Sequence, residues 1–312
     1  MNVAVLGGSG MLGSMVVDWL SRERSLAVTA TVRTPMLLRE FQERCSGVEW
    51  RLLEVDDCSL YDLSDVIRDC EWVINCIGVI KPHIHDNRPT DTERAVFVNA
   101  LFPHLLARAA EQTSCHVLQI ATDCVFSGQR GSYMEHDHHD ALDVYGKTKS
   151  LGEVSSAKVH HLRVSIIGPE PLRHASLLDW FLRHSRGSTV QGYTNHRWNG
   201  ITTLHFARLC HGIMAHKLML AHVHHILSAG AVTKAELLHC VAQKYERTDI
   251  RITTNEAQTS VDRTLATADP ALSRELWRVA GYSEPPSTAQ MIAELAQFDY
   301  RFRIEQYTQQ SY

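Results

Sequence analysis

A tyrosine and a lysine four residues apart, Tyr145 and Lys149, form the pair in this sequence best suited to acid–base chemistry. On a helix, residues at this spacing share a face, with Cβ atoms roughly 5–6 Å apart. A free tyrosine has a pKa of about 10, and we expect the Lys149 ammonium to lower it by favouring the phenolate. Tyr145 could then protonate a developing alkoxide, or accept its proton in the reverse reaction.

A threonine, Thr122, directly follows the apolar run 116–121, which is typical of a strand buried on both faces. Ligands of open α/β sheets gather at the carboxyl ends of the strands. We therefore expect the Thr122 hydroxyl to hold the substrate oxygen for Tyr145, and Asp123 and Cys124 to line the same pocket. The predicted catalytic residues are Thr122, Tyr145 and Lys149.

A glycine-rich turn, GGSGMLG at residues 7–13, follows the predicted strand 2–6 and opens the predicted helix 11–21. Glycines let backbone N–H groups approach a pyrophosphate, and a helix N-terminus adds partial positive charge. The spacing is GxxGxxG and not the commoner GxGxxG, so a plain strand-to-helix turn remains the alternative. From this turn we predict four dinucleotide contacts: Gly7, Gly10, Met11 and Leu12.

An arginine, Arg33, follows the second predicted strand, 27–32. An acidic residue there would bind the ribose hydroxyls of NAD, whereas Arg33 can pair with the 2′-phosphate of NADP. We expect NADP(H) to be preferred and NAD(H) to be allowed, with a solvated arginine as the alternative. Asn99 is expected to support Lys149 through water, and Lys149 to bind the nicotinamide ribose. The remaining predicted cofactor contacts are Glu54, Val55, Cys76, Ile77, Gly78, Asn99, Tyr145, Lys149 and Ile166.

Strand and helix patterns alternate through the first half of the chain, which predicts right-handed crossovers and an α/β fold with a doubly wound parallel sheet of Rossmann type. We expect a dinucleotide-binding domain over residues 1–167, to which the chain returns near residues 195–230. A smaller, mainly substrate-binding part is expected over 168–312. Residues 191–203 are interpreted as a loop, and 305–312 as a frayed tail. The further predicted strands are 50–55, 72–77, 160–167 and 222–228. The further predicted helices are 36–45, 60–69, 94–112, 177–184, 234–245, 270–279 and 287–297.

The overall composition is that of an ordinary globular protein: 312 residues, 44% hydrophobic and 21% charged, with a formal net charge of −4. The negative charge argues against a general nucleic-acid binder, which needs basic surface. The chain has no apolar run of about 18 residues and no signal-peptide pattern, so we expect no membrane span and a cytoplasmic location. Eight cysteines without a CxxC pair are expected to be reduced thiols.

Four further groups of residues are interpreted from their types and surroundings. The segment EHDHHD at 135–140 is interpreted as a solvated loop, with substrate or subunit contact and metal binding as alternatives, and we predict no metal site. His222, His224 and His225 lie among apolar residues and are expected to be structural. Arg197, Trp198 and Asn199 could bind a sugar diphosphate or form a packed loop. Lys81 and Pro82 are expected at the rim of the cleft.

The sequence resembles the extended short-chain dehydrogenases/reductases, and within them the dTDP-4-dehydrorhamnose reductase branch. The resemblance rests on the glycine turn, on VNA at 98–100, on ATDCVFSG at 121–128 and on VYGKTKSLGE at 144–153. Three later stretches, 165–170, 192–200 and 261–265, look like a less-studied offshoot linked to surface polysaccharides. The resemblance implies the Thr122, Tyr145 and Lys149 triad, hydride delivery to a keto group of a nucleotide-linked sugar, and a homodimer formed by the helix at 94–112.

The residue after Thr122-Asp123 separates the expected reaction from its neighbours. The reductase branch usually has tyrosine there and the sugar 4,6-dehydratases have glutamate, whereas this chain has Cys124. A protonated thiol is a weak base, so dehydration is disfavoured. We expect NADPH-dependent reduction of a keto group, at C4, on a nucleotide-activated deoxysugar for surface polysaccharide synthesis. The alternatives are an epimerase that retains its dinucleotide, and a non-catalytic NADP-binding regulatory subunit.

Overall fold

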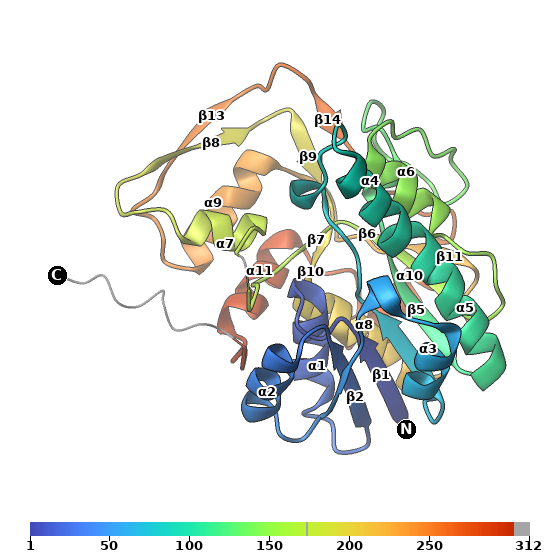
Figure 1. The fold of residues 1–312 in the computed structure, drawn as a ribbon. Helices are drawn as coiled ribbons and strands as arrows, with labels where there is room; N and C mark the ends of the chain where they lie inside the picture. Colours follow the sequence, from blue (N-terminus) through green and yellow to red (C-terminus); the bar gives the residue numbers. More distant parts are fainter. Residues whose placement is uncertain (173, 303–312) are drawn as a thin grey trace.

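A computed structural model describes residues 1–172 and 174–302, and within them seven parallel strands form one sheet in the order β11-β6-β5-β4-β1-β2-β3 (Figure 1). This strand order and the flanking helices confirm the predicted doubly wound α/β fold. Several strands are shorter than predicted, because the chain turns away as soon as pairing ends. The strands are β1 (Asn2–Leu6), β2 (Ala27–Val32), β3 (Glu49–Leu52), β4 (Trp72–Asn75), β5 (His116–Thr122), β6 (Val159–Val164) and β11 (Val223–His225).

The two faces of the sheet are covered by different helices, as strand alternation requires. Val3 and Val5 of β1 belong to a hydrophobic cluster with α1 (Met11–Leu20) and α8 (Thr203–Ala215). The intervening Ala4 and Leu6 belong to a second cluster with α3 (Leu60–Ile67) and α5 (Phe102–Thr113). Two further helices, α2 (Pro35–Arg44) and α10 (Pro270–Val279), join the first cluster.

The predicted helix 94–112 is longer and less regular than expected. The helical run consists of α4 (Pro89–Ala95), a π-helical segment η3 (Val96–Leu101) and α5. A π-helical segment bonds each residue to the fifth along, so it shifts the phase of the helix faces, and such segments frequently mark functional sites. The segment carries Asn99, whose side chain is buried.

The short strands beyond residue 164, other than β11, build a second, smaller region above the sheet (Figure 1), whereas α8, α10 and β11 belong to the main sheet and its cover. In this region the prediction of a loop over 191–203 is wrong. The predicted strand 160–167 also divides, because β7 leaves the main sheet to pair with β10. Each short strand in this region pairs with a distant segment that local patterns do not reveal. The pairs are β7 (Ile166–Ile167) with β10 (Ile201–Thr202), β8 (Thr189–Tyr193) with β13 (Arg251–Asn255), and β9 (His196–Trp198) with β12 (Val232–Thr233) and β14 (Val261–Asp262).

The second region shares its core with the sheet, because α9 (Lys234–Lys244) and α11 (Thr288–Gln297) contribute to the same hydrophobic cluster as β1 and α1. At the end of the described chain, the ring of Phe302 is fully buried and stacks on the ring of Phe41. The predicted tail at 305–312 lies outside the described residues. In the part of the chain that the structure describes, no helix is long and apolar enough to cross a bilayer.

Candidate active site

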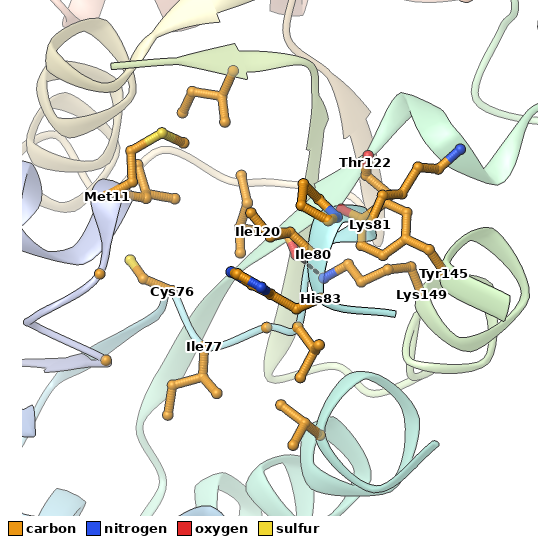
Figure 2. A pocket seen from close by; sticks show the side chains of 18 of the residues that line it. Met11, Cys76, Ile77, Ile80, Lys81, His83, Ile120, Thr122, Tyr145 and Lys149 are labelled. Atoms are coloured by element: carbon orange, nitrogen blue, oxygen red, sulfur yellow. Dashed lines mark hydrogen bonds between the residues drawn. The ribbon is translucent and has the colours of Figure 1, made fainter. Parts of the chain in front are cut away.

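A cavity of about 610 Å³ opens where β1, β2, β4 and β5 end, facing α6 (Val144–Leu151) and residues 170, 172 and 175–177. Its lining joins the glycine turn, Arg33 and the three predicted catalytic residues. Figure 2 shows Met11 and Cys76 on one side of this space, and Thr122, Tyr145 and Lys149 on the other. The predicted cofactor contacts that line it are Gly7, Gly10, Met11, Leu12, Arg33, Glu54, Val55, Cys76, Ile77, Gly78, Tyr145, Lys149 and Ile166.

The glycine turn leaves backbone room that side chains would fill. Gly7 adopts a positive φ of 81°, and its N–H donates to Thr31 Oγ1 at 3.0 Å. A Cβ on Gly13 would lie 2.2 Å from the Gly7 carbonyl oxygen. Gly10 is the N-cap residue of α1. In the described structure no side chain caps this helix, and its first turn contains no acidic residue. Its N-terminal N–H groups and dipole therefore suit a pyrophosphate at the cavity wall.

Two strand ends form the cavity wall beyond the glycine turn. Arg33 follows β2 and is exposed. Glu54 caps a short 3₁₀ turn after β3, and Val55 begins it. An exposed guanidinium beside a phosphate-suited helix end provides a place for a further phosphate on the ribose. Leu53 and Asp56, which the sequence analysis did not select, also line this wall.

Helix α6 presents Tyr145 and Lys149 to the end of β5. Asp143 caps the helix by accepting a hydrogen bond from the Gly146 N–H at 2.7 Å. The Lys149 Nζ donates to the Ile120 carbonyl oxygen at 3.0 Å (Figure 2). Thr122 ends β5, and its Oγ1 accepts from the Cys124 N–H at 3.1 Å. The predicted triad is thus gathered at one end of the cavity.

The expectation that Lys149 lowers the pKa of Tyr145 is contradicted. Burial raises the Tyr145 pKa above its usual value, and the nearby Cys124 and Asp123 raise it further, while a hydrogen bond with Thr122 lowers it in part. Lys149 does not offset these effects, because its own pKa is about 8 and the amine has lost its charge in the pH range where the phenol titrates. Tyr145 is therefore a neutral phenol with a proton to donate at neutral pH.

The carbonyl that holds Lys149 is itself supported by buried amides. Gln119 Nε2 donates to the Ile120 carbonyl oxygen at 3.1 Å, and Asn75 Nδ2 donates to Gln119 Oε1 at 2.7 Å. Burial lowers the pKa of Lys149 to about 8, while Glu153 works in the opposite direction. The amine therefore loses its proton as the pH rises through about 8.

Three of the predicted substrate residues, Lys81, Asp123 and Cys124, line the cavity near Tyr145. The Lys81 Nζ lies 2.6 Å from Asp143 Oδ2 and 6.0 Å from the centroid of the Tyr145 ring. Burial raises the pKa of the Cys124 thiol to about 12 and raises the pKa of Asp123 above its usual value. Cys124 thus keeps its proton at neutral pH and acts as a pocket wall.

The other three predicted substrate residues do not line this cavity. Trp198 donates its indole N–H to Ser165 Oγ at 2.9 Å, and Arg197 forms an exposed ion pair with Asp262. Asn199 is buried, and its side chain bonds both the carbonyl and the N–H of Leu265. Their aromatic and amide groups are used to join β9 to its neighbours, which corrects their assignment to the substrate.

Asn99 is a second correction, because it does not line the cavity either. Its side chain accepts from the Val79 N–H and donates to the Val79 carbonyl oxygen, both at 2.9 Å, and donates to Thr148 Oγ1 at 3.4 Å. Asn99 therefore fixes the loop after β4 against α6.

The structure adds cavity residues that sequence reasoning missed. His83, Asp91 and Arg94 come from the loop after β4 and from α4, and Glu170 and Ser176 come from the segment that follows β7. Strand-end geometry gave no signal for either group, because both return to the cavity through a turn. The glycine at 168 followed by proline was the available sign of such a turn.

The acidic and histidine-rich segment 135–140 is a loop in which four of the six residues are exposed, as expected, but several of its side chains also bond other parts of the protein. Glu135 accepts from the N–H groups of His225 and Ala268, and Asp137 pairs with Arg130. His139 bonds Ser150 and Arg163. Among the described residues, no group of three or more His, Cys, Asp or Glu side chains is arranged to hold a metal ion.

One curated relative matches half of the chain. Over 151 residues, 48% of this chain, the sequence is 29% identical to a protein of Haloferax volcanii described as a probable low-salt glycan biosynthesis reductase, Agl14. The match covers 46% of that protein, so the chain spans about half the length of the curated relative it matches.

Two solved structures have the same fold over nearly their full lengths. The dTDP-4-dehydrorhamnose reductase of Bacillus anthracis, in complex with NADP, has a TM-score of 0.70 at 14% identity, covering 94% of this chain and 98% of that one. The UDP-glucuronic acid 4-epimerase of Bacillus cereus, in complex with UDP-glucuronic acid and NAD, has a TM-score of 0.73 at 16% identity, covering 95% and 99%. At these identities the likeness establishes the fold.

The family comparison covers almost the whole chain and agrees with the resemblance that the sequence motifs suggested. The family described as RmlD substrate binding domain matches residues 1–298, which include the glycine turn, the cavity and most of the second region. This protein belongs to the RmlD substrate binding domain family.

Proposed function

We propose that this protein is an NADPH-dependent reductase of a keto group, at C4, on a nucleotide-activated deoxysugar. The observation that carries the proposal is that one cavity is lined by three features. These are the glycine turn at the N-terminus of α1, which no side chain caps, the exposed Arg33, and the group Thr122, Tyr145 and Lys149. A cofactor cradle and a proton donor in the same space are what carbonyl reduction requires.

The residues present suit a nicotinamide dinucleotide. Gly7 and Gly10 leave the helix end of α1 open to a pyrophosphate, and Arg33 suits a 2′-phosphate. The dinucleotide, when bound, supplies a hydride to the carbonyl carbon. Lys149, held at the end of β5, is placed to bind ribose hydroxyls while it carries a positive charge.

Proton transfer falls to Tyr145. As hydride reaches the carbonyl carbon, negative charge develops on the oxygen, and a protonated phenol beside that oxygen can neutralise it. Tyr145 keeps its proton at neutral pH until the oxyanion forms, and an alkoxide is a stronger base than a phenolate, so the proton can pass to the sugar oxygen. Thr122 supplies a hydroxyl beside Tyr145 that orients the same oxygen. Lys81, Asp123 and Cys124 are proposed to contact the sugar.

The relatives support this choice of reaction. The Haloferax volcanii relative is named as a glycan biosynthesis reductase, and the Bacillus anthracis structure holds NADP. We propose surface polysaccharide synthesis as the pathway class, the cytoplasm as the location and a homodimer as the assembly. We also propose that residues 1–167 mainly bind the dinucleotide and that residues 168–312 mainly bind the substrate.

The test is loss of NADPH or NADH absorbance across a panel of nucleotide-linked 4-keto-6-deoxy sugars, with the Tyr145→Phe variant beside it. Turnover that falls about 100-fold or more in Tyr145→Phe is expected, because general acid catalysis contributes roughly 10²–10⁴-fold. Tight NADPH binding without consumption for any sugar would contradict the reductase. A dinucleotide retained through purification, with an epimerised product, would instead indicate an epimerase.

A further inference from the structure

A group of charged and imidazole side chains with a buried centre lies beneath the end of α6, outside the cavity. We call it the Arg163 cluster, and it consists of Glu135, His139, Glu153, Arg163 and His225. The side chain of Arg163 is 1% exposed and that of Glu153 is 7% exposed. Arg163 holds the Glu153 carboxylate with two hydrogen bonds, Nε to Oε1 at 3.0 Å and Nη2 to Oε2 at 2.6 Å.

The two histidines of the Arg163 cluster have their tautomers set by its geometry. Because a guanidinium can only donate, His139 Nε2 and His225 Nε2 must accept from Arg163, at 2.9 and 2.7 Å. Their Nδ1–H groups then donate to Ser150 Oγ at 2.6 Å and to the Ala266 carbonyl oxygen at 2.7 Å. Burial lowers the pKa of both imidazoles, that of His225 to about 4, so both are neutral at physiological pH.

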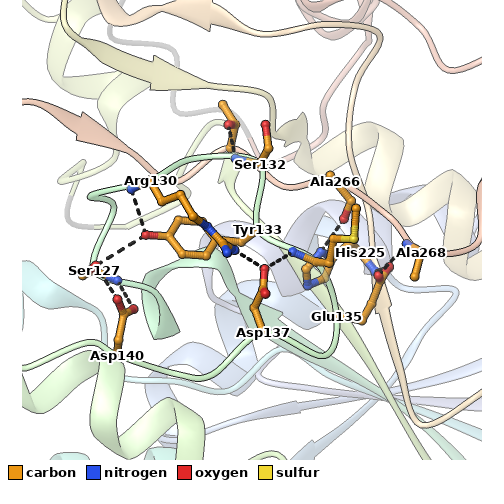
Figure 3. A network of polar contacts seen from close by, with 12 residues as sticks. Ser127, Arg130, Ser132, Tyr133, Glu135, Asp137, Asp140, His225, Ala266 and Ala268 are labelled. Atoms are coloured by element: carbon orange, nitrogen blue, oxygen red, sulfur yellow. Dashed lines mark hydrogen bonds and ion pairs between the residues drawn. The ribbon is translucent and has the colours of Figure 1, made fainter.

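The Arg163 cluster joins segments that surround the proposed active site. Glu153 and Ser150 belong to α6 and its end, Arg163 to β6, and His225 to β11. Figure 3 shows His225 bonded to Ala266, and Glu135 bonded to Ala268. The guanidinium of Arg163 also lies 5.2 Å from the centroid of the Phe126 ring, three residues after Asp123. The cluster therefore fixes α6 relative to the end of β5.

One member of the cluster also acts on Lys149 by its charge. Burial works to raise the pKa of Glu153, but the hydrogen bonds and charge of Arg163 outweigh it and hold that pKa below its usual value. Glu153 is thus an anion, and it stands four residues beyond Lys149. We propose that Glu153, held by Arg163, is a positioning residue that acts through Lys149, keeping the amine charged and directed at the end of β5. Its consequence for catalysis rests on the proposed reductase function.

The charges that face Lys149 can be named element by element. On α6 the titratable group that faces it is Tyr145, which is neutral. Glu153 lies just beyond the end of α6. On β6, Arg163 is occupied by Glu153, and burial lowers the pKa of His161 to about 4, so it is also neutral. On β5 the partner is the Ile120 carbonyl oxygen. Glu153 is therefore the anion that opposes the burial of Lys149, whose pKa is about 8.

The direct test measures the protonation of Lys149 without sugar or dinucleotide. The intact protein is acetylated briefly with an N-hydroxysuccinimide ester between pH 6 and 10, and the Lys149 peptide is quantified by mass spectrometry. Replacing Glu153 with glutamine should move the midpoint for Lys149 from about 8 to about 7, since loss of a nearby opposite charge disfavours the ammonium. Asp65→Asn, which removes an exposed carboxylate paired with Arg68 on α3, is the matched control and should leave the midpoint unchanged.

The single substitution leaves Arg163 buried without its anion, which can prevent folding. The double variant Glu153→Gln/Arg163→Gln removes both charges. Its midpoint for Lys149 should also be lowered, but by less than in the single variant, because the Arg163 cation that disfavours the ammonium is gone as well. A folded variant, single or double, whose labelling curve matches that of the parent protein would overturn the proposal.

The kinetic test uses the alkaline limb of kcat with an accepted sugar. The charged form of Lys149 is present below its pKa and lost above it, so the limb should move down by about one pH unit in Glu153→Gln, while kcat near pH 6.5 changes less than twofold. A shifted labelling midpoint with an unshifted limb would overturn the link to catalysis. Failure of turnover with every sugar, with the labelling shift present, would contradict the proposed reductase function and leave the charge coupling standing.

Discussion

The cofactor side of the cavity and the second region are built in different ways. On the cofactor side, the glycine turn, Arg33, Glu54 and Cys76 each follow a strand of the main sheet within two residues of its end. The second region consists of short strands such as β8 and β9, which pair with β13 and β14 some 60 residues away. The cofactor side depends on local turns, whereas the second region depends on long-range pairing.

This difference separates two kinds of polar residue. On the cofactor side, the glycine turn and Arg33 line the cavity because the carboxyl ends of parallel strands meet at one edge of the sheet. In the second region, Trp198 and Asn199 spend their hydrogen-bonding groups on joining segments distant in the chain. Substitutions in the two regions should therefore fail differently, either in ligand affinity or in stability.

The strongest expected effect is at Gly13. A Cβ there would lie 2.2 Å from the Gly7 carbonyl oxygen, which is backbone and cannot turn aside. Gly13→Ala should cost about 3 kcal/mol, the upper part of the usual overpacking range, and should weaken NADPH binding about 100-fold as the turn shifts. Fluorescence titration of NADPH measures the binding.

Gly47 provides the matched control for this substitution, because a Cβ there meets nothing within 4 Å. Gly47→Ala should bind NADPH as the parent protein does. Unchanged binding in a folded Gly13→Ala variant would show that the turn does not hold the dinucleotide.

The next effect is a change of cofactor preference at Arg33. Charge-assisted hydrogen bonds contribute roughly 1.5–3 kcal/mol, so Arg33→Ala should weaken NADPH binding about 30-fold and leave NADH binding almost unchanged. Equilibrium titration with both dinucleotides measures the ratio. Arg39→Ala, which removes an exposed arginine of α2, is the control and should preserve the ratio of the two affinities. Equal losses for the two dinucleotides would place Arg33 away from the 2′-phosphate.

Much of the main sheet and the gathered position of Thr122, Tyr145 and Lys149 could be predicted from the sequence, because both follow from local spacing. Parallel strands bring their carboxyl ends together, and an i, i+4 pair shares one helix face. Asn99 could not be placed this way, because its partners Val79 and Thr148 are distant in the sequence and no local pattern names them.

The direction in which the Tyr145 pKa shifts could also not be predicted from the sequence. Spacing placed an ammonium on the same helix face, but the pKa depends on how deeply the phenol is buried and where the Lys149 Nζ points. Likewise, an aromatic and an amide beside a glycine suit either a sugar pocket or a strand junction. Long-range partners such as Leu265 decide between them, and no local pattern names those partners.

In the second region, Asn199 should affect stability and leave ligand binding intact. Asn199→Ala would leave the carbonyl and N–H of Leu265 without their side-chain partner, at a cost of about 1–2 kcal/mol in the free energy of unfolding. Urea denaturation measures this loss, and KM for sugar in the folded fraction should stay within twofold. Asn87→Ala, at an exposed asparagine, is the control. A raised KM with unchanged stability would return Asn199 to the substrate site.

The smallest effect is expected at Arg197. Its substitution is the sharpest test of whether the second region contacts the substrate. Its guanidinium lies 3.7 Å from Asp262 and its side chain is 55% exposed, so solvent screens the pair. Arg197→Ala should change the free energy of unfolding by less than about 0.5 kcal/mol, as exposed ion pairs usually do, and should leave KM for the sugar nucleotide unchanged. Arg68→Ala, at another exposed pair, should behave alike in denaturation and kinetics. A tenfold rise in KM for Arg197→Ala alone would mean that the second region closes over the substrate and brings this arginine to its diphosphate.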